Sequence, residues 1–293
     1  MGHWQPRPVN TALDDYGAMM VAAEKRRVIE ILIGPPGSPG KLITDGDIAF
    51  RTKHYKGSKP NEGTAVIANL SDATVAAIEA PGNVMQIRAG VGSPGKLFYG
   101  DILKGSGVTT KESTPERVTT VKAKDGHRAF RDLTASLAYP PNTPVAQVVK
   151  DLVALAQASD RLVLGLGSVY PTDSFPAGWA CSGKWRRALT EILAPRGYYW
   201  TIQGRVIYIM QQSAQPPGNV PLVSPQTDMV GSPTRTKKGV NFVSRLNPAV
   251  VAGFGVMIKS RSINGLYRAA VVEHAGGKRG LEWKTQAQCE AIR

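Results

Sequence analysis

Residues 229–275 read MVGSPTRTKKGVNFVSRLNPAVVAGFGVMIKSRSINGLYRAAVVEHA, and this stretch decides the fold class. Apolar runs begin at Val240 and at Phe254, and the tripeptide LNP at 246–248 ends the first of them. The Asn-Gly pair at 264–265 stands between two apolar runs, and it predicts a turn because both residues tolerate a positive φ. Short strands separated by turns predict an antiparallel β domain, either a barrel or a sandwich.

Residues 28–124 have the same character. Residues 48–55 alternate in character, which indicates a half-buried strand. One face carries Ile48, Phe50, Thr52 and His54, and the other carries Ala49, Arg51, Lys53 and Tyr55. Ser71 is placed to cap a short helix over residues 72–78. Evenly spaced runs joined by turn residues predict a small antiparallel barrel, with strands over residues 28–33, 48–55, 64–70, 84–89, 96–103 and 118–123.

The residues between these stretches, 125–215, show helical periodicity instead. Thr143 before Pro144 predicts an N-cap with proline in the first turn. Asp125 follows a strand and precedes a helix, so it is expected to form a turn and cap that helix. The expected elements are helices over 126–135, 145–157 and 183–193, the last ending at Pro195 and Gly197, then a hairpin of 198–202 with 206–210.

The chain of 293 residues therefore divides into four expected parts. They are an N-terminal arm (1–27), a first β-barrel domain (28–124), an α+β module (125–215), and a linker with a second β-barrel domain (216–293), in which the Pro-rich residues 216–228 form the linker. The expected fold class is mainly β, with an α+β insertion between two antiparallel barrels. For the arm, attachment to a neighbouring subunit and simple fraying both remain open.

The chain is strongly basic, with a formal net charge of +14 at pH 7. Such a charge predicts attraction to polyanions. The basic residues are spread along the chain, and no zinc finger, aromatic stripe or basic heptad helix accompanies them. A generally basic surface is therefore favoured over specific nucleic-acid recognition.

Residues capable of catalysis or metal binding do not form a recognisable motif. The four histidines lack metal-ligand spacing, and His54 and His274 are expected at a surface or interface. Cys181 and Cys289 are far apart in sequence and are expected to be free thiols. The glycine-rich stretches at 34–40, 165–167 and 276–278 indicate turns rather than phosphate loops. We expect no catalytic, cofactor-binding or metal-ligating residues, no cofactor and no enzymatic activity.

The sequence shows no signal peptide and no apolar run of the roughly 18 residues that a transmembrane helix needs. We expect a protein without a membrane anchor, made in a cytoplasm and either soluble or built into an assembly.

Six segments stand out for their order and spacing along the chain. They are NLSDATVAAI (69–78), VMQIRAGVGSPGKLFYGDIL (84–103), RVTTVKAKDGHRAF (117–130), GKWRRALTEILAPRGYYWTIQGRVIYI (183–209), and residues 229–248 and 264–289. Together they resemble the baseplate hub proteins of tailed bacteriophages, also called tail hub or late control protein D-like proteins. The resemblance covers residues 28–293 and leaves out the arm.

The resemblance implies a structural virion protein of the tail baseplate. Hub proteins of this family carry two tail-tube-like barrels per chain, so a homotrimer presents six barrels and connects a sixfold tail tube to a threefold central spike. The implied partners are the tail tube or tube-initiator protein, the central spike, the tape measure protein and the baseplate wedge proteins. DNA is expected only as cargo in the channel. Residues 260–264 join two strands directly where some relatives insert a module, which implies a minimal hub.

Two other classes of function remain as alternatives. The net charge of +14 favours a basic nucleic-acid-binding protein. A cell-wall hydrolase is the less favoured alternative, because the chain has no spare length for the hydrolase domain that some hub relatives carry.

Overall fold

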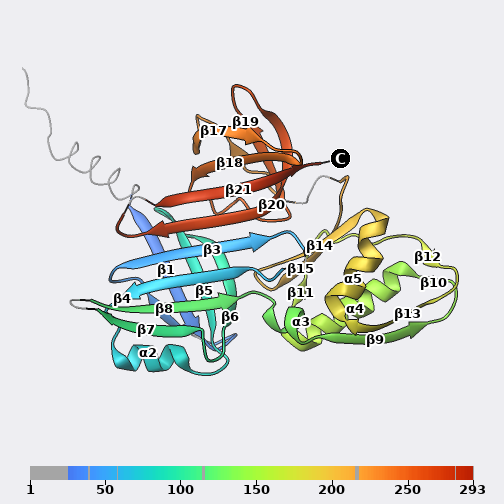
Figure 1. The fold of residues 1–293 in the computed structure, drawn as a ribbon, viewed down its shortest axis with the longest axis horizontal. Coiled ribbons are helices and arrows are strands. Elements are labelled where there is room, and N and C mark those ends of the chain that lie inside the picture. The colour runs from blue at the N-terminus through green and yellow to red at the C-terminus, as the bar shows by residue number, and fades with distance from the viewer. Residues whose placement is uncertain are drawn as a thin grey trace, which may run out of the picture.

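The computed structural model describes residues 26–292 apart from positions 39, 58, 114–115, 215–217 and 281. The expected N-terminal arm therefore lies almost wholly outside the described residues. Figure 1 shows strands of the two β regions side by side, with the α+β region at one end.

The first β region contains the expected strands and helix. Ser71 caps the helix as predicted, and its Oγ accepts a hydrogen bond from the Thr74 amide at 3.3 Å. Two strands, β2 and β7, are not expected from the sequence. β2 has only three residues, and β7 (VTTKES) lacks the apolar alternation that marks a strand. The elements are β1 (Arg27–Gly34), β2 (Lys41–Ile43), β3 (Ile48–Tyr55), β4 (Glu62–Ala68), α2 (Asp72–Glu79), β5 (Val84–Val91), β6 (Gly95–Ile102), β7 (Val108–Ser113) and β8 (Glu116–Lys124).

This sheet bends around an apolar core. On β3, Ile48 and Phe50 point inward as the alternation predicts. The strands run in the order β3-β4-β8-β6-β5-β1-β2, and in Figure 1 β1 and β5 cross behind β3 and β4. No pairing of β2 or β1 with β3 completes the circle among the described residues, so the region is a curved open sheet rather than the closed barrel expected.

The second β region also has its own core, and one predicted turn in it lies elsewhere. Asn264 and Gly265 do not form the turn but begin β20, opposite Lys259 and Ile258. The turn lies just before them, at residues 260–263, where the Ser260 amide donates to the Ile263 carbonyl at 3.0 Å. The expected linker also contains a short strand. The elements are β16 (Leu222–Val223), β17 (Met229–Arg235), β18 (Gly239–Arg245), β19 (Gly255–Lys259), β20 (Asn264–Gly277) and β21 (Trp283–Ala291).

The two β regions share one 14-stranded sheet, joined by β20 and β3. The antiparallel register runs from Val271 opposite Tyr55 to Gly277 opposite Ala49. A bulge near Ala270 shifts the pairing of β20 with β21, and the Ala270 carbonyl accepts the Lys56 amide at 2.8 Å. Gly276 is required at this seam, because a Cβ there would lie 2.7 Å from Trp283. In the part of the second region that the structure describes, the sheet does not close either, since its order ends at β17.

Three local expectations for the α+β region are wrong. The helix predicted over 126–135 ends at Arg131, and residues 134–139 form a strand that pairs with β13. Residues 183–184 belong to β13, and Pro144 rather than Thr143 occupies the N-cap of α4. The elements are α3 (His127–Arg131), β9 (Thr134–Tyr139), β10 (Thr143–Pro144), α4 (Val145–Asp160), β11 (Val163–Leu164), β12 (Ser174–Phe175), β13 (Trp179–Lys184), α5 (Trp185–Leu193), η1 (Ala194–Arg196), β14 (Tyr198–Gln203) and β15 (Val206–Gln211).

The core of this region lies between α4, α5 and the hairpin of β14 and β15. Trp185 is fully buried, stands edge-on to Trp200 with ring centroids 5.2 Å apart, and donates its indole N–H to the Leu152 carbonyl at 2.6 Å. The helix expected over 145–157 forms as α4, and its apolar residues at helical spacing, among them Val148, Val149 and Leu152, are buried. The core residues of this cluster all fall between positions 129 and 209, so the region has its own source of stability.

Candidate functional site

The junction of the first β region with the α+β region is organised by a buried carboxylate, Asp125. Only 1% of Asp125 is exposed, and its carboxylate accepts the amides of Gly204 at 2.6 Å and Arg205 at 3.0 Å. Gly204 and Arg205 both have positive φ, which turns their amides toward Asp125 in the tight hairpin between β14 and β15. Asp125 therefore holds a distant hairpin and does not cap α3, whose N-cap is Gly126.

Asn61 extends this junction into the sheet. Its Nδ2 donates to the Ile202 carbonyl at 2.7 Å and to Gln203 Oε1 at 3.1 Å, while its Oδ1 accepts the Tyr55 amide at 2.9 Å. Buried polar groups joined in this way fix one arrangement, because any other arrangement leaves them without partners.

Burial raises the pKa of Asp125 to about 6, against the opposing effect of the two amides, Asn61 and Arg205. Replacing Asp125 with alanine is expected to lower the free energy of unfolding by about 2 kcal/mol, because two buried amides lose their acceptor. Chemical denaturation at pH 7.5 measures the change. Replacing the exposed Asp132 with alanine is the control and is expected to change stability by less than about 0.5 kcal/mol. Equal effects of the two changes would contradict this role.

The seam between the two β regions holds a buried histidine pair, His54 from β3 and His274 from β20. They are 7% and 3% exposed, so the surface or interface position expected for them is wrong. Their ring centroids lie 5.9 Å apart. His54 Nδ1 lies 3.1 Å from Gln203 Oε1, and His274 Nδ1 lies 2.8 Å from Thr285 Oγ1. Burial lowers the pKa of His54 to about 4 and that of His274 to about 3, so both rings are neutral at pH 7.

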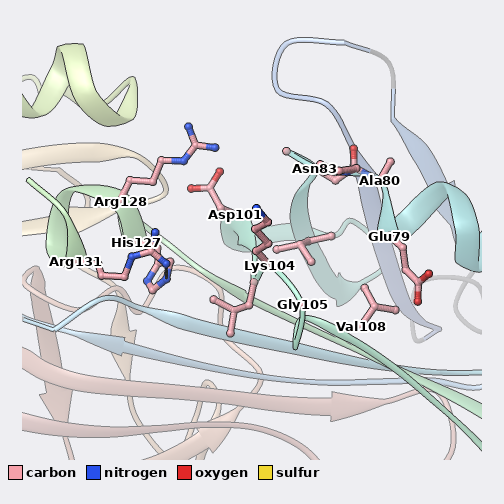
Figure 2. Close-up of a pocket in the computed structure, with 14 residues that line it drawn as sticks. Glu79, Ala80, Asn83, Asp101, Lys104, Gly105, Val108, His127, Arg128 and Arg131 are labelled. Atoms are coloured by element: carbon pink, nitrogen blue, oxygen red, sulfur yellow. Dashed lines mark hydrogen bonds between the residues drawn. The ribbon is translucent and has the colours of Figure 1, made fainter.

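A cleft of about 630 Å³ opens between the first β region and the α+β region. Its walls are the α2–β5 connection, the β6–β7 connection and α3. Figure 2 shows Lys104, Asp101 and Arg128 together, with His127 and Arg131 beside them and Glu79 on the other side. The cleft therefore presents mostly cationic groups.

Asp101 forms a largely buried ion pair with Arg205, and each side chain is 12% exposed. Because Arg205 neutralises it, Asp101 does little to offset the cations around it. A second cleft of about 570 Å³ lies on the other side of this pair, between the Pro35-Pro36 turn and the C-terminal end of α4. Asp101 thus lines both clefts, and Arg205 lines the second.

Within the described residues, no group of three or more His, Cys, Asp or Glu side chains is placed to hold a metal ion. Cys181 and Cys289 are free thiols, as expected. Among the helices of the described chain, none is both long and apolar enough to span a membrane. The expectation of no catalytic or cofactor site stays a prediction.

No protein-family model matches the chain, and no curated protein matches it. Solved structures do match it in fold. The tail protein from Neisseria meningitidis MC58 has a TM-score of 0.60 at 11% identity and covers 90% of this chain and 96% of its own. The 43 kDa tail protein of prophage MuSo2 from Shewanella oneidensis has a TM-score of 0.62 at 7% identity, covering 90% and 97%.

A third match is the Escherichia coli c3393 protein, a type VI secretion component described as structurally similar to the T4 bacteriophage tail proteins gp27 and gp5. Its TM-score is 0.57 at 11% identity, over 90% of this chain and 77% of its own. At such identities the likeness establishes the fold alone. The chain therefore has the mainly β fold of phage tail proteins and of a related secretion component.

Proposed function

We propose that this chain is a structural virion protein, a baseplate hub of the late control protein D-like family. The observation that carries the proposal is a mainly β fold shared with two tail proteins over 90% of this chain and nearly all of theirs. No catalytic role is proposed, and we expect no clearing of cell-wall substrate in a zymogram.

The arrangement of the two β regions supports a role at a symmetry mismatch. Each region has its own buried core, and β3 and β20 join them in one sheet. A chain that presents two such regions side by side, residues 28–124 and 216–293, offers two comparable surfaces to its neighbours. Three chains in a closed ring then present six surfaces to a sixfold tube and three chain-specific surfaces to a threefold spike. In the ring, each β region would act as one tail-tube-like unit.

In this proposal the ring belongs to the tail baseplate of the virion and is assembled in the host cytoplasm. Its partners are the tail tube or tube-initiator protein, the central spike, the wedge proteins and the tape measure protein, and DNA passes through the channel only as cargo.

The proposal predicts a homotrimer with three times the 31.3 kDa mass of the chain. Native mass spectrometry and sedimentation at micromolar concentration measure the mass, and class averages from electron microscopy test for a threefold ring with a central channel. The same measurements with spike protein added test whether the ring needs its partner to close. A monomer under both conditions would contradict the hub proposal.

A further inference from the structure

The two clefts beside the Asp101–Arg205 pair adjoin each other. Both are lined by Pro81, Gly82, Asp101 and Arg128. We call the combined feature the junction groove. It runs from the β6–β7 connection past Arg128 to the C-terminal end of α4, and so it passes from the first β region to the α+β region.

Cations without ion-pair partners surround this groove. Lys104, Arg128 and Arg161 have exposed side chains, and none of them forms an ion pair with another described residue. Two of the three carboxylates that line the clefts are already engaged, since Asp101 pairs with Arg205 and Asp160 accepts the Ala129 amide at 3.1 Å. The third, Glu79, lies across the first cleft from Arg128. Most exposed charges on a protein surface are solvated and need no partner. Here, however, the three cations line a concave feature, where the electrostatic field of like charges is concentrated.

His127 also lines the groove. Burial lowers its pKa, and the nearby charges of Arg131 and Lys124 lower it further. Arg131 itself pairs with Asp132 at 2.6 Å, so the cations left for a ligand in the described part of the groove include Lys104, Arg128 and Arg161.

The shape of the groove suits an extended chain. Its walls include the Pro35-Pro36 turn and the loops at Gly82 and Gly105, where nothing lies within 4 Å of the point that a Cβ atom would occupy. Each cleft has the volume of a small-ligand pocket, about 300–1,000 Å³. The shape and charge together favour a short acidic peptide segment.

We propose that the junction groove binds an extended, acidic segment of a partner protein. Carboxylates of the segment would pair with Arg128 and Lys104 in one cleft and with Arg161 in the other, with charge-assisted hydrogen bonds from the guanidinium groups. Because the groove lies between two regions of one chain, the proposal holds whether or not three chains form a ring.

The test measures binding of a fluorescein-labelled 12-residue peptide of alternating Glu and Gly by fluorescence anisotropy at 50 and 150 mM NaCl. A peptide with Gln in place of Glu is the uncharged control. We expect saturable binding of the acidic peptide that weakens with salt, and no binding of the Gln peptide. Failure of the acidic peptide to bind at 50 mM NaCl would overturn the proposal.

A matched pair of double variants assigns the binding to the groove. Lys104→Glu with Arg128→Glu is expected to weaken binding at least about tenfold. Lys237→Glu with Lys238→Glu makes the same change in net charge on the exposed turn between β17 and β18, and binding is expected to stay within about twofold. Equal losses would mean that only net charge attracts the peptide, and the proposal would fall.

Two further measurements separate peptide binding from folding and from affinity for nucleic acid. The milder change Lys104→Gln with Arg128→Gln should weaken binding in the same direction while the melting temperature stays unchanged. A duplex DNA of 20 base pairs that binds more tightly than the peptide, with the same loss in the Lys104→Glu and Arg128→Glu variant, would overturn the peptide proposal in favour of nucleic-acid binding. Trimer mass is recorded for every variant, so that loss of the ring is distinguished from loss of the peptide.

Discussion

Replacing Trp185 with alanine is expected to lower the free energy of unfolding of the α+β region by about 4 kcal/mol. The indole is fully buried, and the alanine variant lacks its edge-on contact with Trp200 and its hydrogen bond to the Leu152 carbonyl. The cavity left behind adds to the lost transfer free energy, because α4 and α5 cannot close over a space of that size without moving their other contacts.

The effect should be confined to the α+β region, because its core is separate from those of the two β regions. Calorimetry is expected to show the unfolding of this region at a lower temperature, and hydrogen exchange should accelerate over α4 while the amides of β3 remain protected. Trp185→Phe retains a ring and is the control, with an expected cost of less than half as much. A uniform acceleration over the whole chain would contradict independent cores.

Acid is expected to weaken the seam between the two β regions through His54 and His274. The folded-state pKa values, about 4 and about 3, lie below the unfolded value of 6.5, so the folded protein binds fewer protons than the unfolded chain. The free energy of unfolding therefore falls as pH drops below about 6.5, and it is unaffected by these groups above about pH 7.5. For His54 alone the loss at pH 4.5 is about 2 to 3 kcal/mol.

Asp125 acts in the opposite direction, because its pKa is raised to about 6 and its protonation in the folded state adds stability as pH falls from 6 to about 4. The measurement therefore compares variants rather than the wild type alone. Denaturation of His54→Leu between pH 7.5 and 4.5 should show a pH-dependent loss smaller by about 2 kcal/mol than that of the wild type. His127→Gln, outside the seam, is the comparison: the pKa of His127 is also lowered, but its side chain is less buried, so a smaller reduction is expected. Parallel pH profiles for wild type and His54→Leu would show that the seam histidine does not titrate as inferred.

Much of the secondary structure can be predicted because its signals are local. The alternation of Ile48 and Phe50 predicts β3 with its observed bounds, and Ser71 predicts the start of α2. Trp185 and Leu189 recur at helical spacing and are buried on α5 as expected. In each case the period of the apolar residues and the capping chemistry are properties of neighbouring residues.

The errors arise where distant partners override local preference. Residues 134–139 follow a short helix in the sequence, yet they form β9, because all six pair with β13, which lies forty to fifty residues later. The Asn-Gly pair at 264–265 has the chemistry of a turn, but its residues are paired with β19. Pairing of this kind depends on backbone groups, which carry no side-chain signal.

The candidate site can be predicted only in part. His54 shares a face of β3 with Ile48 and Phe50, so the alternation itself indicates an inward position rather than the surface position expected for a histidine. No sequence signal connects Asp125 to the amides of Gly204 and Arg205, since these groups meet only when the hairpin folds back on the sheet. Lys104, Arg128 and Arg161 likewise become one groove only in three dimensions.

The apolar periods of residues 229–275 and of the other regions are enough to predict a mainly β chain with an α+β region between two β regions, because each period fixes an element and its buried face. The joining of the two β regions into one open sheet through β20 and β3, and the basic groove beside it, become visible only in the folded chain. Apolar periodicity is encoded residue by residue, whereas the choice of strand partner depends on how complete faces pack and on which backbone groups then meet.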